Sequence, residues 1–265
     1  MSLDDLSDDE LGVWFEGISA EAARTYPGTP TEVRYGPHPL QVIDIWGDQS
    51  APVWVVSIHG GYFAAAYDRT VNEPLSRRLA AAGFAVANVE YRRAGSTDDA
   101  FDTVTDVRSA VAHTAALKPP GSRLVVTGHS AGGYLALVAS SHPDVLASLP
   151  LAPVTYLART SLGGWDEGSI ATWIGSQPEE DPQGWARMEP ISLGLPTATT
   201  VILHGASDKV VPLALTEDFI ADPAVARSAQ IGLVTLLDVG HFEFLDPTSD
   251  VVEDLAVLLE GLASR

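Results

Sequence analysis

The chain of 265 residues contains no cysteine. This absence excludes a disulfide framework and any metal site built from thiolates. The sequence also lacks an uninterrupted apolar run of about 18 residues, so no segment is expected to span a membrane. Residues 1–10 are acidic and have no apolar core, which does not fit a signal peptide. Together these absences favour a cytoplasmic protein.

Basic residues are scarce as well. The sequence has 15 Lys and Arg residues against 35 Asp and Glu residues, which gives a net charge of −20. Such a surplus repels the phosphates of nucleic acids and anionic membrane surfaces, so neither is expected as a partner. The sequence has no His-Glu-x-x-His pattern, no Cys/His cluster, no Walker loop and no Gly-x-Gly-x-x-Gly loop. We therefore expect no metal and no cofactor, and a small molecule as the partner.

The sequence does contain a regular alternation of strand-like and helix-like segments, which predicts a single domain over residues 1–265. Its hydrophobic content of 46% is sufficient for a buried core. Ser7 and Glu10 form a capping-box pattern that predicts a helix over residues 8–24. Strands are expected at 32–35, 40–46, 53–58, 84–90, 123–127, 145–151, 199–203 and 230–237. Further helices are expected at 72–82, 98–118, 131–141 and 250–262.

Strands that alternate with helices predict βαβ units. The expected architecture is therefore α/β, with a mostly parallel central sheet of about eight strands and helices on both faces. One segment, at about residues 155–195, interrupts the alternation. It carries Trp165, Trp173 and Trp185. It is interpreted either as a small cap over the site or as a surface excursion whose tryptophans fill its own core.

The pentapeptide Gly128-His-Ser-Ala-Gly132 matches Gly-x-Ser-x-Gly. In this motif a serine occupies a strained turn between a strand and a helix, and small neighbours let the backbones pass closely. The predicted strand 123–127 and helix 131–141 supply that context. The pattern predicts that Ser130 is a nucleophile, against the simpler interpretation of a structural turn. Its place at a helix N-terminus favours developing negative charge.

A serine nucleophile needs a base and an acid that orients the base. In the fold that usually carries the Gly-x-Ser-x-Gly motif, the three residues follow one another in the chain order Ser, then Asp or Glu, then His. Three histidines follow the serine: His142, His204 and His241. His142 fits a capping role at a helix end, and His204 ends a strand and is expected to pack locally. His241 follows the last predicted strand, which is where a loop-borne base belongs.

The acid is expected in the loop after the preceding strand. Asp208 lies there, ahead of Pro212. Its alternative interpretation is a turn or helix-capping aspartate. Asp238 is the main rival, but it is too close in sequence to His241 to belong to a separate loop. Glu243 is interpreted as a flanking polar residue.

Donors for an oxyanion are expected in His59-Gly-Gly-Tyr-Phe63, which directly follows the predicted strand 53–58. The glycines permit unusual dihedrals and a close backbone approach, although an ordinary glycine turn is the alternative. His59 is expected to form hydrogen bonds within this loop. The expected oxyanion residues are Gly60, Gly61, Tyr62 and Ala131.

On these motifs the chain resembles the esterase/lipase-like branch of α/β-hydrolases, and especially kynurenine formamidase (arylformamidase). The resemblance rests on five parts of the sequence. These are the His59 loop, Glu90-Tyr-Arg92, the pentapeptide 128–132 (the nucleophile elbow) with Gly133, the Asp208 loop and Gly240-His-Phe242. It implies the α/β-hydrolase fold and a triad of Ser130, Asp208 and His241. The chain departs from typical formamidases in Gly133-Tyr134 after the elbow and in Phe63, where a tryptophan is usual.

The resemblance implies a serine hydrolase that cleaves an ester or an N-formyl amide, with N-formylkynurenine as the best specific guess. A general carboxylesterase acting on short acyl esters is the alternative, and a non-catalytic binding protein is a third possibility of another class. A monomer or a homodimer is expected. Candidate substrate-binding aromatics, each of which could equally belong to the core, are Tyr62, Phe63, Trp165, Trp173 and Phe242.

Overall fold

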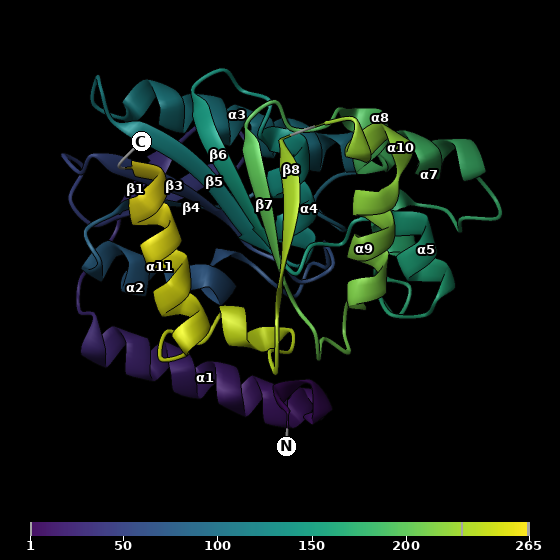
Figure 1. Cartoon of the computed structure of the whole chain (residues 1–265), viewed down its shortest axis with the longest axis horizontal. Helices are drawn as coiled ribbons and strands as arrows, with labels where there is room; N and C mark the ends of the chain where they lie inside the picture. The colour runs from purple at the N-terminus through teal and green to yellow at the C-terminus, as the bar shows by residue number, and fades with distance from the viewer. Residues whose placement is uncertain (1, 229, 264–265) are drawn as a thin grey trace.

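A computed structural model describes residues 2–228 and 230–263. Eight strands form one sheet in the order β1-β2-β4-β3-β5-β6-β7-β8 (Figure 1). This confirms the expected sheet of about eight strands. Their bounds are β1 Thr31–Arg34, β2 Val42–Trp46, β3 Val53–Ile58, β4 Ala85–Val89, β5 Arg123–His129, β6 Val145–Leu151, β7 Thr199–Gly205 and β8 Ile231–Leu236.

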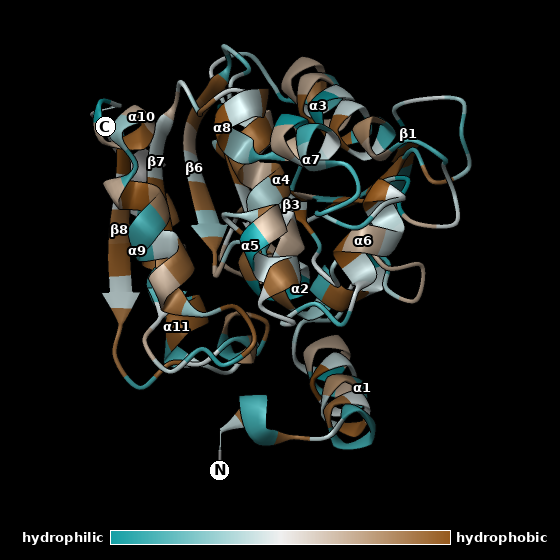
Figure 2. Ribbon diagram, turned by 90° about the vertical axis from the view of Figure 1, so that its right-hand side faces the viewer, coloured by the Kyte–Doolittle hydropathy of each residue, from teal (hydrophilic) through white to brown (hydrophobic). Residues whose placement is uncertain are grey.

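The sheet is parallel from β4 to β8, and β1 and β2 are antiparallel additions at one edge. The carboxyl ends of the parallel strands therefore meet at one end of the molecule. In Figure 2 the arrowheads of β6 and β8 point toward this end. A functional site assembled from loops at the strand ends belongs there.

Helices cover both faces of the sheet, as expected. On one face α3 (Ala100–Leu117) and α4 (Ala131–Ala139) bury apolar side chains against Trp54 and Val56, and on the other α2 (Glu73–Ala81) and α11 (Asp250–Ala263) pack against Val55. The alternation along β3 explains its unbroken apolar run, since both of its faces are buried. The helices α9 (Leu213–Ala221) and α10 (Pro223–Ala226) complete the molecule near β7 and β8.

The N-terminal segment consists of a 3₁₀ turn, η1 (Leu3–Asp5), followed by α1 (Asp8–Thr25). The predicted capping box is present, because Ser7 accepts from the Glu10 amide and the Glu10 side chain accepts from the Ser7 amide. Both views place α1 at the end of the molecule where the parallel strands finish (Figures 1 and 2). The sequence predicted this helix but not its position.

The segment 155–195 folds into four short helices: α5 Leu157–Leu162, α6 Ser169–Ile174, α7 Pro182–Met188 and α8 Pro190–Leu193. Trp173 and Trp185 are buried, whereas Trp165 remains 39% exposed. Two of the three tryptophans thus fill the interior, and the third lies at the surface of the segment.

Several boundaries differ from the expected ones because pairing continues further than propensity predicted. β5 extends to His129 because its ladder with β6 continues through Gly128 and His129. β7 extends to Gly205, which pairs with β8.

The helix expected at 72–82 starts instead as a 3₁₀ turn, η2 (Arg69–Asn72), before α2. No helix within the described residues is long and apolar enough to cross a membrane.

Candidate active site

A cavity of about 490 Å³ opens at the carboxyl end of the sheet. Ser130 and His241 line it, so the structure brings the expected nucleophile and base to one cavity. Its walls come from the N-terminal segment, the residues after β3, the turn at Ser130, the insertion and the loops after β7 and β8. The lining residues used below are Asp4, Leu6, Asp8, Leu11, Phe15, Gly61, Tyr62, His129, Trp165, Asp166, Glu167, Lys209, Val210 and Phe242.

Ser130 occupies a strained turn between β5 and α4. Its φ of 58° and ψ of −120° lie outside the regions that non-glycine residues prefer. The neighbouring glycines make this turn possible. A Cβ added at Gly128 would lie 2.2 Å from the Gly132 carbonyl oxygen, and a Cβ added at Gly132 would lie 2.1 Å from the Ile58 oxygen. A residue held in such a backbone conformation is typical of a functional site.

The Asp208 carboxylate holds the His241 ring. The His241 Nδ1 donates to Asp208 Oδ2 over 2.8 Å, which leaves Nε2 as the ring nitrogen that Asp208 does not engage. The other carboxylate oxygen, Oδ1, accepts from the amides of Val210 and Val211 at 2.9 and 2.7 Å. This arrangement fixes the imidazole tautomer in which Nε2 can accept a proton.

Asp208 is buried yet ionised. Burial alone would raise the pKa of its carboxyl group. The charge of His241 and the hydrogen bonds from His204 and His241 outweigh burial, so the pKa of Asp208 is held well below its ordinary value. A carboxylate with such a pKa can stabilise a positively charged imidazole during a reaction.

His129, the residue before Ser130, connects the turn at Ser130 to the loop after β8 that carries His241, the expected base. This loop is called the base loop below. Its Nε2 donates to the His241 carbonyl oxygen over 2.8 Å. Burial, and then the charge of His241, hold the pKa of His129 well below its usual 6.5. A neutral His129 therefore fixes the backbone of the base. The sequence analysis did not assign it a role, because the second position of the elbow motif accepts many residue types.

The His59 loop lies against Ser130. An added Cβ on Gly60 would lie 2.7 Å from the His129 oxygen and 3.1 Å from the Ser130 Cβ. Gly61 has φ +100°, and Tyr62 also lies in the left-handed region with φ 48°. Among the described residues, the backbone N–H groups of Gly61, Tyr62 and Ala131 donate no hydrogen bond to the rest of the chain. These N–H groups are thus available to an external acceptor.

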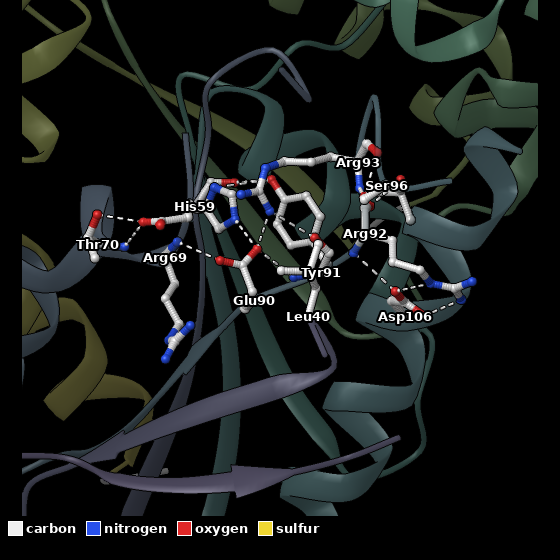
Figure 3. Close-up of polar contacts among 12 residues, drawn as sticks. Leu40, His59, Arg69, Thr70, Glu90, Tyr91, Arg92, Arg93, Ser96 and Asp106 are labelled. Carbon is white, nitrogen blue, oxygen red and sulfur yellow. Dashed lines mark hydrogen bonds and ion pairs between the residues drawn. The ribbon is translucent and has the colours of Figure 1, made fainter. Parts of the chain in front are cut away.

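A buried polar network supports this loop from behind (Figure 3). The His59 Nδ1 bonds to the Gly60 oxygen at 2.9 Å, and the His59 ring stacks on Tyr91 with centroids 4.2 Å apart. Glu90 lies 3.3 Å from His59 Nε2 and forms an ion pair with Arg93. The expected hydrogen bond of His59 within its loop is present, and Glu90-Tyr91 fixes the far side of the ring.

The predicted aromatic residues divide into two groups. Tyr62, Trp165 and Phe242 line the cavity. Phe63 and Trp173 do not line it: both are buried and stack on each other with ring centroids 3.8 Å apart. Both rings pack in the core between the His59 loop and α6 of the insertion, which is the alternative that the sequence left open for them.

The N-terminal segment supplies a cavity wall that the sequence analysis missed. Asp4, Leu6 and Asp8 line the cavity, and Leu11 and Phe15 extend this wall along α1. No local pattern could have indicated this role for Asp4 and Phe15. Asp4 bonds to the Lys209 and His241 amides and Phe15 packs on Phe242, all more than 200 residues away.

The rival residues have other partners. His204 contacts Thr216 Oγ1 at 3.0 Å and the Val211 oxygen at 2.9 Å, and its Nε2 lies 3.2 Å from Asp208 Oδ2. His142 accepts from the Asp144 amide. Asp238 is exposed in the turn after β8. Glu243 accepts from the Gly240 amide at 3.1 Å and so supports the base loop. Within residues 2–228 and 230–263, no group of three or more His, Asp or Glu side chains could hold a metal ion.

Comparisons with known proteins agree with this fold. The model of the BD-FAE family matches residues 44–148, which is less than half of the chain. A search of curated proteins found no match. A truncated carbohydrate esterase from gut microbiota superposes with a TM-score of 0.70 at 17% identity, covering 91% of this chain and 98% of that chain.

Two further solved structures are similar. Esterase B from Lactobacillus rhamnosis, inhibited by a tributyrin phosphonate, has a TM-score of 0.70 at 16% identity and covers 98% of this chain and 97% of its own. The bifunctional GH43-CE protein of Bacteroides eggerthii has a TM-score of 0.72 at 20% identity. That likeness covers 87% of this chain, which spans only 37% of the Bacteroides chain. These likenesses show the α/β-hydrolase fold, as the sequence predicted.

Proposed function

We propose that this chain is a serine carboxylesterase that cleaves uncharged esters through an acyl-enzyme on Ser130. The observation that carries the proposal is the 2.8 Å bond between His241 Nδ1 and Asp208 Oδ2 beside a cavity that Ser130 shares. Similar proteins support ester hydrolysis, since they include a carbohydrate esterase and an esterase inhibited by a phosphonate.

The reaction follows from the geometry. Ser130 Oγ attacks the ester carbonyl while His241 Nε2 takes its proton, and Asp208 stabilises the imidazolium. The N–H groups of Gly61, Tyr62 and Ala131 receive the oxyanion. His241 then returns the proton to the departing alcohol. A water molecule, activated by the same ring, releases the acid and restores the serine.

The cavity wall favours an uncharged substrate with an apolar or aromatic part. Leu11, Phe15 and Phe242 supply apolar surface, and the volume of about 490 Å³ suits a small aromatic ester. The cationic group in the described lining is Lys209, against the carboxylates of Asp4, Asp8, Asp166 and Glu167. A negatively charged substrate would meet repulsion there.

The order of the two substrate classes rests on the similar proteins, which include esterases. N-formylkynurenine carries both an amino-acid carboxylate and an α-ammonium group, so its net charge is zero and the acidic lining repels one group while it attracts the other. Formyl-amide hydrolysis uses the same triad and oxyanion donors, so it remains the second candidate on the strength of the sequence resemblance. A comparison of kcat/KM for N-formylkynurenine and for neutral aryl esters decides between them, and a higher value for N-formylkynurenine would reverse the order.

Replacement of the nucleophile tests the proposal. We expect Ser130→Ala to lose at least about 1,000-fold in kcat on p-nitrophenyl acetate, because covalent catalysis is removed. A fluorophosphonate probe should label the wild-type protein at Ser130 and leave the variant unlabelled.

Ser109→Ala is the matched control, since Ser109 lies exposed on α3 and, among the described residues, its hydroxyl bonds only to the Thr105 carbonyl. It should keep wild-type turnover and labelling. A folded wild-type protein that neither labels nor turns over any ester in the panel would instead favour the non-catalytic binding protein. Unchanged turnover in Ser130→Ala would refute the assignment of the nucleophile.

A further inference from the structure

The Asp4 carboxylate connects the two loops that carry the acid and the base. Its Oδ2 accepts from the Lys209 amide at 2.9 Å, directly after Asp208. Its Oδ1 and Oδ2 accept from the His241 amide at 2.9 and 3.1 Å. One side chain near the N-terminus thus holds a backbone N–H beside the acid and the backbone N–H of the base itself.

Local structure builds this contact. Asp4 lies in η1, whose first turn is capped by Ser2, and η1 packs against η3 (Phe242–Phe244) of the base loop. Gly240 permits the close approach, because an added Cβ there would lie 2.9 Å from both Asp4 carboxylate oxygens. The adjacent Asp5 forms an ion pair of 2.5 Å with Lys209 Nζ. Residues from two distant parts of the chain, the loops of Asp208 and His241, therefore converge on the Asp4 carboxylate.

The base loop has several supports, but Asp4 differs from the others. Glu243 binds the Gly240 amide and comes from the same loop. His129 binds the His241 carbonyl and comes from the elbow. Asp4 alone among these three also bonds to the acid loop. Hydrogen bonds to an ionised acceptor are roughly twice as strong as neutral ones, so this bridge resists separation of the two loops.

We propose that Asp4 is a positioning residue. It holds the acid and base loops in the relative position at which His241 reaches both Asp208 and Ser130. This rests on the proposed function of the site. Asp4 does not exchange a proton in the reaction. Its effect is on the alignment of the imidazole, and misplacement of a catalytic group by about 1 Å can cost on the order of 100-fold in rate.

The first experiment separates positioning from substrate contact, because Asp4 also lines the cavity. In Asp4→Ala we expect kcat to fall about 10- to 100-fold by the same factor for p-nitrophenyl acetate and for a bulky aryl ester, with KM changed less than about twofold. Asp4→Asn keeps one oxygen acceptor and should recover part of kcat. Asp9→Asn removes an exposed carboxylate of α1 that lies outside the cavity lining, so it is the matched control and should keep the wild-type kcat.

A double-mutant cycle with Gly240 tests the bridge further, because the single variant Gly240→Ala perturbs the bridge while it keeps the carboxylate. Gly240→Ala places a methyl group against Asp4 and should lower kcat in the same way. Since Asp4→Ala removes the clash, the double variant should be no slower than Asp4→Ala alone. Additive losses in the double variant would contradict the bridge, and circular dichroism verifies that each variant is folded.

The outcomes distinguish the two proposals. Wild-type kcat in both Asp4→Ala and Gly240→Ala, in a protein that Ser130→Ala inactivates, would overturn the role of Asp4 and leave the esterase proposal standing. A rise in KM confined to the bulky ester would show that Asp4 is only a cavity wall. Absence of turnover in the wild-type protein would overturn the proposed function instead.

Discussion

At the scale of single residues, the candidate site depends on backbone conformations that are costly elsewhere. Ser130 and Tyr62 both have positive φ, and each such position costs of the order of 1–3 kcal/mol. The surrounding structure maintains them because β5 and α4 are anchored on either side of Ser130 and Tyr62 donates from its hydroxyl to the Val210 oxygen over 3.2 Å. Both of these residues line the cavity.

Asp208 gives a prediction for the acid side of the pH range. Its folded-state pKa lies below the ordinary 3.8, so its ionised form stabilises the fold at pH values above 3.8. That contribution is lost as the pH falls below 3.8 toward the folded-state pKa. We expect the free energy of unfolding of the wild-type protein to fall more steeply between about pH 5 and pH 3 than that of Asp208→Asn.

Urea unfolding at a series of pH values measures this difference. Parallel curves for the two proteins would mean that the ionisation of Asp208 does not contribute to stability as described.

Asp208→Asn should also lose most of its kcat at neutral pH, because an amide can present its N–H to His241 and favour the wrong tautomer.

At the scale of elements, the cavity is closed by two segments that are far apart in sequence. The insertion provides Trp165, and α1 provides Leu11 and Phe15. The rings of Phe15 and Phe242 lie edge to face with centroids 6.0 Å apart, so α1 packs directly on the base loop. The wall formed by α1 is therefore expected to affect which substrates fit, separately from the chemistry.

Truncation of this wall tests that role. In Phe15→Ala the ratio of kcat/KM for a bulky aryl ester to that for p-nitrophenyl acetate should fall about three- to tenfold, since about one buried aromatic contact is lost. Val13 lies on the same helix but is 71% exposed, which makes Val13→Ala the control. A ratio that changes equally in both variants would count against a wall formed by α1.

At the scale of the whole molecule, the sheet determines where the loops of the site lie, and the net charge determines the electrostatic field around them. The carboxyl ends of β3, β5, β7 and β8 meet at one end, which brings residues 59–63, 130, 208 and 241 together. The net charge of −20 acts on anything that approaches this end. Such long-range effects weaken as salt is added, because the Debye length shortens.

The field leads to a measurable salt dependence. For an ester that carries a carboxylate, kcat/KM should rise severalfold between about 0.02 M and 0.5 M NaCl, because screening removes repulsion. For a neutral ester of the same size it should change less than about twofold over the same range. The same salt response for both esters would contradict an electrostatic contribution to substrate choice.

Local pattern was enough to predict the strands, the longer helices and the order of the chemical groups, but not the short helices between residues 157 and 193. The β-branched run at Val53–Ile58 must be buried on both faces, and glycines around Ser130 leave room for backbones that pass within van der Waals distance. These features depend on neighbours in sequence, so the α/β architecture and the expected positions of Ser130, Asp208 and His241 follow from short windows.

Tertiary structure alone decided which side chains face the cavity and which residues hold the reactive groups in place. Phe63, Trp173 and Trp165 are all large aromatic residues, so the sequence did not distinguish them. In the structure Phe63 and Trp173 stack in the core. Asp4 reads as one more acidic residue until η1 is placed beside the loops of Asp208 and His241. The reason is physical: periodicity records which face of an element is buried, whereas contacts between elements 200 residues apart depend on how those elements pack.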